Sequence, residues 1–225
     1  MGLILNIDTS TEMASICLAK DGVVIGSSQN QDQKDHASWL HLAIEEILNK
    51  ADVKAINLDA LAVTIGPGSY TGLRVGLAAA KGLCYALKIP LITENTLKVM
   101  ALSAAHQADI LSDFLICPMI DARRMEVFTA VYTAEMQELM APSALILNKN
   151  SFENFFVDHT IAFLGSGTPK WRTLITSDKA VFLDTPFLAK FLGIISYRKW
   201  QAAEFTDIIY SEPIYLKEFH THIRK

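Results

Sequence analysis

The sequence has no surplus of positive charge, no long apolar run and few cysteines, and each shortage excludes a class of protein. Its 225 residues include 20 Lys and Arg against 24 Asp and Glu, so the net charge is −4. A stand-alone nucleic-acid binder, which holds phosphates by releasing their counterions, is therefore not expected. No uninterrupted apolar run approaches the roughly 18 residues that cross a bilayer, so we expect no membrane association. Because 51% of the residues are hydrophobic, we expect a well-packed globular chain.

The cysteines and the N-terminus indicate a cytoplasmic protein. Cys17, Cys84 and Cys117 are odd in number, far apart and set in apolar sequence, which is typical of reduced, packed thiols. The first residues carry no basic segment and reach an aspartate at position 8. We therefore expect a buried strand at the N-terminus and not a signal peptide.

A pattern of strands opens the chain and returns near its midpoint. Apolar residues 3–8, 13–19 and 22–29 predict three strands, the last two joined by an Asp-Gly hairpin turn. Residues 114–121 and 125–133 repeat an apolar strand that ends in Asp and a strand that pairs back on it. The two aspartates, Asp8 and Asp121, are 121 − 8 = 113 residues apart, which is half of the chain. We therefore predict an internal duplication into two similar lobes.

The remaining periodicity predicts helices between further strands. A helix over 37–50, capped by Asp35, and a nearly all-apolar helix over 71–87 flank a strand over 58–65, and a strand at 89–93 and a helix over 97–105 follow. The second half predicts strands at 144–147, 160–167 and 181–184, an amphipathic stretch at 152–156, and helices from 169 and over 186–204. We place the lobes at 1–105 and 106–225, with the final helix or tail free to pack back on the first lobe.

Two turns are candidates for contact with a nucleotide phosphate. Actin-like and sugar-kinase-like proteins begin each lobe with a strand that ends in Asp and a turn that faces the phosphate. Here those turns begin with Asp8-Thr9-Ser10 and with Asp121, and neither contains the glycine that close approach to an anion requires. Two interpretations stay open, namely a vestigial phosphate contact and a hairpin whose Asp and hydroxyl groups satisfy the turn amides.

A glycine-rich turn leads into the helix at 71–87. Its residues Gly66, Gly68 and Ser69 precede a helix N-terminus, where free amides and the helix dipole attract anions. The segment matches neither G-x-x-x-x-G-K-[ST] nor G-x-G-x-x-G, so close packing of the helix is the alternative. Farther along this helix, Arg74 and Lys81 are seven residues apart and share one face, from which they would reach a rim or a partner's carboxylates.

The sequence predicts no metal site and no catalytic residue. His36 and His41 are five residues apart, which separates them by about 140° around a helix, whereas a zinc-binding pair at i, i+4 is about 40° apart. No nucleophile lies in a recognisable elbow. A metalloprotease is excluded on these grounds, and we expect no cofactor on this chain.

Residues 5–11 and 66–83 together resemble the TsaB (YeaZ) family, a subunit of the bacterial machinery that makes threonylcarbamoyladenosine in tRNA. The resemblance continues through MIDARRMEVFTAVY (119–132), LGSGTPKW (164–171) and EPIYLK (212–217), where Lys217 replaces the usual Arg. It implies an α/β, actin-like (ASKHA, RNase H-like) fold with two similar lobes of mixed sheets flanked by helices. It also implies a non-catalytic role.

The resemblance further implies partners. They are a TsaD-like catalytic subunit and a TsaE-like ATPase, with ATP and metal on these subunits, and tRNA is reached through the complex. The modification lies next to the anticodon in tRNAs that read codons beginning with adenine. In the family the first lobe's two helices pair with their counterparts in TsaD, and on this sequence those are 37–50 and 71–87. The expected interface residues are Leu40, Ile44, Ile47, Leu48, Leu73, Arg74, Leu77 and Lys81.

Two alternatives accompany this interpretation. The isolated chain would form a homodimer if the same apolar helices paired with themselves. An actin-like nucleotide-binding enzyme, such as a small-molecule kinase or ATPase with Asp8 and Asp121 in the inter-lobe cleft, is the alternative function. Its size is against it, because two lobes in 225 residues leave little chain to grip a nucleotide and a second substrate.

Overall fold

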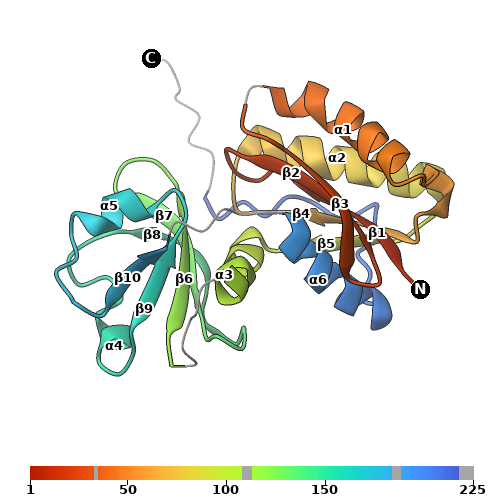
Figure 1. Ribbon diagram of the computed structural model, residues 1–225. Coiled ribbons are helices and arrows are strands. Elements are labelled where there is room, and N and C mark those ends of the chain that lie inside the picture. The colour runs from red at the N-terminus through yellow and green to blue at the C-terminus, as the bar shows by residue number, and fades with distance from the viewer. Residues whose placement is uncertain (33–34, 108–112, 184–188, 218–225) are drawn as a thin grey trace, which may run out of the picture.

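The computed structural model describes residues 1–32, 35–107, 113–183 and 189–217. Its first half forms a five-stranded mixed sheet with strand order β3-β2-β1-β4-β5 (Figure 1). The strands are β1 (Leu3–Asp8), β2 (Ala14–Lys20), β3 (Val23–Asn30), β4 (Ala60–Thr64) and β5 (Leu91–Glu94). The first three pair antiparallel, while β4 runs parallel to β1 and β5 parallel to β4. The continuous apolar sequence of β1 and β4 reflects burial on both faces of the sheet.

A second five-stranded sheet repeats this topology, with order β10-β9-β6-β7-β8. Its strands are β6 (Leu115–Asp121), β7 (Glu126–Tyr132), β8 (Glu138–Ile146), β9 (Ile161–Leu164) and β10 (Ala180–Leu183). Here too the first three strands pair antiparallel and the last two extend the sheet in parallel. The predicted duplication is thus confirmed as a repeat of topology. The strand predicted at 144–147 is longer than expected and begins at 138.

Helices cover both sheets and fill the space between them. Over one face of the first sheet, α1 (His36–Lys50) and α2 (Tyr70–Leu87) lie side by side (Figure 1), with the short η2 (Ala55–Asn57) after α1. Between the sheets lie α3 (Thr96–Gln107), which packs on β6, and α6 (Ala189–Gln201), which packs on the first sheet. Two short helices, α4 (Glu153–Phe156) and α5 (Thr168–Arg172), complete the second half.

The core consists of three main clusters, one of which is shared by the two halves. The shared cluster joins Ile4 and Ile92 of the first sheet to Ile116 and Leu164 of the second through α3 and α6. A second cluster lies under α1 and α2, and a third on the outer face of the second sheet around Phe163. Since α6 follows the second sheet in the chain but packs on the first, the last helix crosses back, while the boundary at residue 105 stays a prediction.

One local expectation is wrong. Asp35 precedes α1, but its side chain makes no capping bond to a helix amide; it accepts from the Ser38 hydroxyl instead. Side-chain caps occur at α2, where Ser69 Oγ accepts from Gly72 N at 3.3 Å, and at α3, where Asn95 Oδ1 accepts from Leu97 N at 2.9 Å. Among the helices that the structure describes, none combines the length and apolar character needed to cross a bilayer.

Candidate functional site

A buried carboxylate lies at the end of β1. Asp8 is fully buried, and its Oδ1 accepts from the backbone amide of Ser10 at 3.2 Å, from the Ser10 hydroxyl at 2.6 Å and from the Thr64 hydroxyl. Within the described residues no donor reaches Oδ2. Burial raises the pKa of Asp8 to about 6, although the hydrogen bonds from Ser10 and Thr64 act in the opposite direction. The carboxylate is thus engaged by its own turn and by β4.

The N-terminus of α2 closes over this turn. Ser69 N donates to Ser10 O at 2.7 Å, and the Thr9 hydroxyl donates to Gly72 O at 2.7 Å. A Cβ at Gly68 would overlap the carbonyl oxygen of Ser10, and a Cβ at Gly72 would overlap that of Thr9. The glycines therefore serve close approach of two backbones. These bonds agree with a hairpin that is engaged within the chain and with a closely packed helix, while a vestigial phosphate contact stays a prediction.

The corresponding turn after β6 is open. The Asp121 side chain is 44% exposed, and its Oδ1 accepts from the amide of Arg123 and from Lys170 Nζ, both at 2.6 Å. Burial opposes ionisation of Asp121, but the hydrogen bonds from Lys170 and Arg123 and the charge of Lys170 outweigh it and lower the pKa. Among the described residues, no hydrogen bond or ion pair joins Asp121 to Asp8, Thr9 or Ser10. The two aspartates are therefore not in direct contact.

The apolar residues predicted to face a partner belong to the chain's own core. They are between 0 and 7% exposed and pack between the first sheet and its two covering helices: Leu40, Ile44, Ile47, Leu48, Leu73 and Leu77. The structure corrects the predicted interface at these six residues, because the apolar stripe of each helix faces the chain's own sheet. The side that stays exposed carries Thr71, Ala78, Gly82 and Tyr85 of α2, beside Leu42 of α1. We call these five residues the outer face.

The two cations of α2 hold the C-terminal tail, so the tail as well as α6 packs back on the first lobe. We call residues 205–217 the strap. Arg74 Nε donates to the hydroxyl of Tyr215 at 3.1 Å, and Lys81 Nζ donates to the carbonyl oxygens of Ile209 at 3.3 Å and Ser211 at 3.0 Å. The strap also donates from Ile214 N to Ile65 O at 2.7 Å. At its end, Lys217 forms an ion pair with Glu126 of β7, so the strap joins the two sheets.

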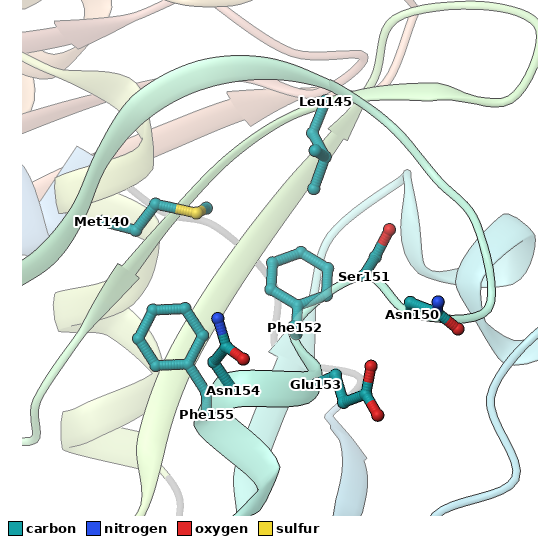
Figure 2. A pocket seen from close by; sticks show the side chains of 8 residues that line it. All are labelled: Met140, Leu145, Asn150, Ser151, Phe152, Glu153, Asn154 and Phe155. Carbon is teal, nitrogen blue, oxygen red and sulfur yellow. The ribbon is translucent and has the colours of Figure 1, made fainter.

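A cavity of about 350 Å³ lies elsewhere, between β8 and α4. Figure 2 shows Phe152 and Phe155 facing it from one side, with Met140 and Leu145 of β8 on the other. None of the predicted site residues lines it. Among the residues that the structure describes, no three His, Cys, Asp or Glu side chains gather as a metal site would need. His36 is buried and His41 is exposed, so the two do not face a common site.

Comparison with known proteins identifies the family. Residues 24–171 match the family model described as TsaD: tRNA N6-adenosine threonylcarbamoyltransferase. The chain is 32% identical over 175 residues to the tRNA threonylcarbamoyladenosine biosynthesis protein TsaB of Bacillus subtilis, covering 76% of this chain and 74% of that protein. The TsaB protein of Escherichia coli is 26% identical over 226 residues, covering 95% and 94%.

Solved structures show the same fold. YeaZ from Pseudomonas aeruginosa superposes with a TM-score of 0.78 at 24% identity, covering 96% of this chain and all of that chain (100%). The ethanolamine utilization protein EutJ from Carboxydothermus hydrogenoformans gives a TM-score of 0.54 at 10% identity, with 88% and 90% covered. The two repeated mixed sheets flanked by helices are thus the actin-like arrangement. The chain belongs to the TsaB (YeaZ) family.

Proposed function

We propose that this chain is the accessory subunit of the complex that forms N6-threonylcarbamoyladenosine in tRNA. It pairs with a TsaD-like catalytic subunit, stabilises it and helps to recruit a TsaE-like ATPase, and it acts in the cytoplasm. The support is the agreement with proteins named for this pathway, which in Escherichia coli extends over 95% of the chain. Substrate tRNA is bound by the assembled complex, as the net charge of −4 suggests.

The observation that carries the accessory role is the closed turn after β1. In an actin-like enzyme this turn faces the phosphate of the nucleotide, but here Thr9 is 1% and Ser10 0% exposed. The Thr9 hydroxyl donates to Gly72 O of α2, and Ser10 O accepts from Ser69 N at the start of α2. The Ser10 hydroxyl donates to Asp8, so the polar groups of this turn already have partners within the chain. This supports a chain without a nucleotide of its own, with ATP and metal on the partner subunits.

The kinase-like alternative has less support. It requires Asp8 and Asp121 to act together at the inter-lobe cleft. Asp8 is fully buried, and Asp121 is engaged by Lys170. Under this proposal the purified chain alone hydrolyses no ATP and transfers no threonylcarbamoyl group. Turnover above a control without enzyme, lost in Asp8→Ala, would favour the kinase instead.

Pairing is assigned to the outer face. Leu42 is 68% and Tyr85 81% exposed, and apolar side chains of this size and exposure are typical of a contact surface. Ala78 and Gly82 lie on the same side of α2 as Tyr85, and nothing from elsewhere in the described residues comes within 4 Å of a Cβ at Gly82. Small residues leave room for a partner's helix to approach closely. A homodimer of the isolated chain would use the same face.

A charge placed on the outer face tests the pairing. Ala78 is exposed, so Ala78→Arg is expected to fold normally but to lose co-purification with the TsaD-like subunit, because the new charge would be buried without a partner. Ile56→Arg is the matched control, since Ile56 is 70% exposed on η2 and is not one of the five residues of the outer face. Retained pairing in Ala78→Arg would refute the face. Undiminished tRNA modification by a reconstituted complex that lacks this chain would refute the function itself.

A further inference from the structure

We propose that the β6–β7 turn and the adjoining end of the strap form a contact for the phosphate backbone of tRNA. The inference rests on the proposed function and names a surface for its substrate. Its residues are Arg123 and Arg124 in the turn, Lys170 and Lys217 beside it, and Arg74 across the strap. We call these five cations the basic rim.

The turn keeps two arginines where its backbone favours other residues. Arg123 and Arg124 have φ values of 68° and 49°, and both side chains are exposed. Left-handed positions in turns are ordinarily occupied by Gly or Asn, and an L side chain in this conformation costs about 1 kcal/mol per residue. The hydrogen bonds Ala122 N to Glu126 O and Glu126 N to Arg123 O, both 3.1 Å, hold the turn in place. The backbone conformation therefore does not account for arginine at these two positions.

The carboxylates near the turn are already neutralised. Lys170 Nζ lies 2.6 Å from Asp121 Oδ1, and Lys217 forms an ion pair with Glu126. In the part of the chain that the structure describes, no ion pair or side-chain hydrogen bond engages the guanidinium group of Arg123 or Arg124. Both groups are therefore available for an external anion, and a guanidinium matches the geometry of phosphate oxygens.

The basic rim continues across the strap onto the first lobe. The ring of Tyr215 is 5.2 Å from that of Tyr70, and the Arg74 guanidinium lies 4.0 Å above the Tyr70 ring. Two residues beyond Tyr215, Lys217 reaches Glu126 of the second lobe. The five cations thus follow one path over both lobes, accompanied by the carboxylates of Asp121 and Glu126 and by the exposed Glu212 of the strap. This local excess of positive charge contrasts with the net charge of −4 for the whole chain.

RNA explains this arrangement better than an acidic protein does. Tyr70 and Tyr215 are 37% and 38% exposed beside the cations, and partly exposed rings next to positive charges are how proteins hold unpaired nucleotides. The relatives act in the modification of a tRNA, which is a phosphate-rich substrate. A few cations give too little affinity to bind tRNA alone, but they can strengthen binding when the partner subunit supplies further contacts.

The test replaces the arginines without disturbing the turn. Arg123→Asn with Arg124→Gly places residues that tolerate a left-handed backbone at the two left-handed positions, so the variant is expected to fold at least as well as the wild type. Binding of unmodified tRNA to the complex with the TsaD-like subunit is measured by fluorescence anisotropy at several salt concentrations. With two phosphate contacts removed, the affinity is expected to be lower at low salt. Between about 50 and about 200 mM salt, it should fall about tenfold less than the wild-type affinity does.

Two controls make the result specific. Lys20→Ala with Arg198→Ala removes two exposed cations outside the basic rim, at the end of β2 and on α6, and changes the net charge equally, so its salt dependence should match the wild type. Arg123→Lys with Arg124→Lys keeps both charges and should retain the salt dependence. If Arg123→Asn with Arg124→Gly binds tRNA like the wild type while the complex modifies tRNA normally, the inference is wrong and the proposed function stands. If that variant instead loses its TsaD-like partner, the turn contacts protein, which also overturns the inference. A wild-type complex that neither binds nor modifies tRNA would refute the proposed function.

Discussion

Replacing the buried carboxylate at the end of β1 should stabilise the protein at neutral pH. Asp8→Asn keeps an oxygen that can accept from Ser10 and Thr64, as Oδ1 does in the wild type. It removes a negative charge from a fully buried position, where no described donor reaches the second oxygen. The variant therefore tests whether the charge itself is a cost to the fold.

The magnitude follows from the pKa of Asp8. Burial raises it from the ordinary value of 3.8 to about 6, so the folded state holds this proton more tightly than the unfolded state does. The stabilisation from the bound proton is complete below pH 3.8 and is lost as the pH rises through about 6. At about 1.4 kcal/mol per pH unit, the loss approaches about 3 kcal/mol. Because Asn resembles the protonated acid, Asp8→Asn should be more stable than the wild type by up to about 3 kcal/mol at pH 7.

The assay is urea unfolding of both proteins at several values between about pH 4 and about pH 8. The advantage of Asp8→Asn should vanish toward the acid end. Asp121→Asn is the control with the opposite sign, because the pKa of Asp121 is lowered and its charge is paired with Lys170. That variant should be slightly less stable at neutral pH, with a deficit that shrinks as the pH falls. A lower stability of Asp8→Asn at pH 7, or a difference that does not change with pH, would refute the reasoning.

Two further predictions concern the contacts of α2. Gly72→Ala should lower the free energy of unfolding by about 1 to 3 kcal/mol, because its Cβ would overlap the carbonyl oxygen of Thr9. Gly82→Ala, where the added Cβ meets no neighbour, should raise it by up to about 1 kcal/mol. Thermal unfolding compares the two variants, and equal effects would contradict the close packing at Gly72. Lys81→Met removes both hydrogen bonds to the strap while keeping the apolar part of the side chain. Amide hydrogen exchange should therefore become faster in residues 205–211 and stay the same in β1. An unchanged exchange rate in residues 205–211 would mean that Lys81 does not hold the strap.

The sequence predicts most of the elements because hydrophobic periodicity is a local property. The helix expected over 37–50 is His36–Lys50, and the one expected over 71–87 is Tyr70–Leu87. The same periodicity misled the choice of interface residues, since an apolar stripe does not say whether a sheet or a partner covers it. Leu40 and Leu77 face the chain's own sheet, and only the complete fold shows that Leu42 and Tyr85 stay exposed.

The individual contacts of the strap could not be predicted from the sequence for another reason. The strap has no periodic pattern, and its bonds join residues as far apart as Arg74 and Tyr215 or Lys81 and Ser211. The spacing of Arg74 and Lys81 did indicate that they share one side of α2. It could not indicate that the groups they meet are a phenol and backbone carbonyls of the same chain, because such acceptors occur everywhere in a sequence.

The sequence could not show which of the two Asp-containing turns is buried and which is exposed either, because both contain the same local hydrogen bond from a backbone amide to the aspartate. Asp8 accepts from the amide two residues on at 3.2 Å, and Asp121 does the same at 2.6 Å. What differs is where the next helix begins. In the first lobe Ser69 N donates to Ser10 O, two residues after the aspartate, so α2 covers the turn.

In the second lobe, the equivalent bond from Gly167 N goes to Met119 O, two residues before the aspartate. The helix that follows, α5, therefore meets the strand and stops short of the turn. A shift of four residues in the contact point closes the first turn and leaves the second exposed. The two repeats thus differ in what their turns do. The first turn is sealed as part of the core, and the second can present Arg123 and Arg124 to a ligand. It follows that bulk introduced at Gly68 should damage the fold, whereas charge removed at Arg123 and Arg124 should damage only binding.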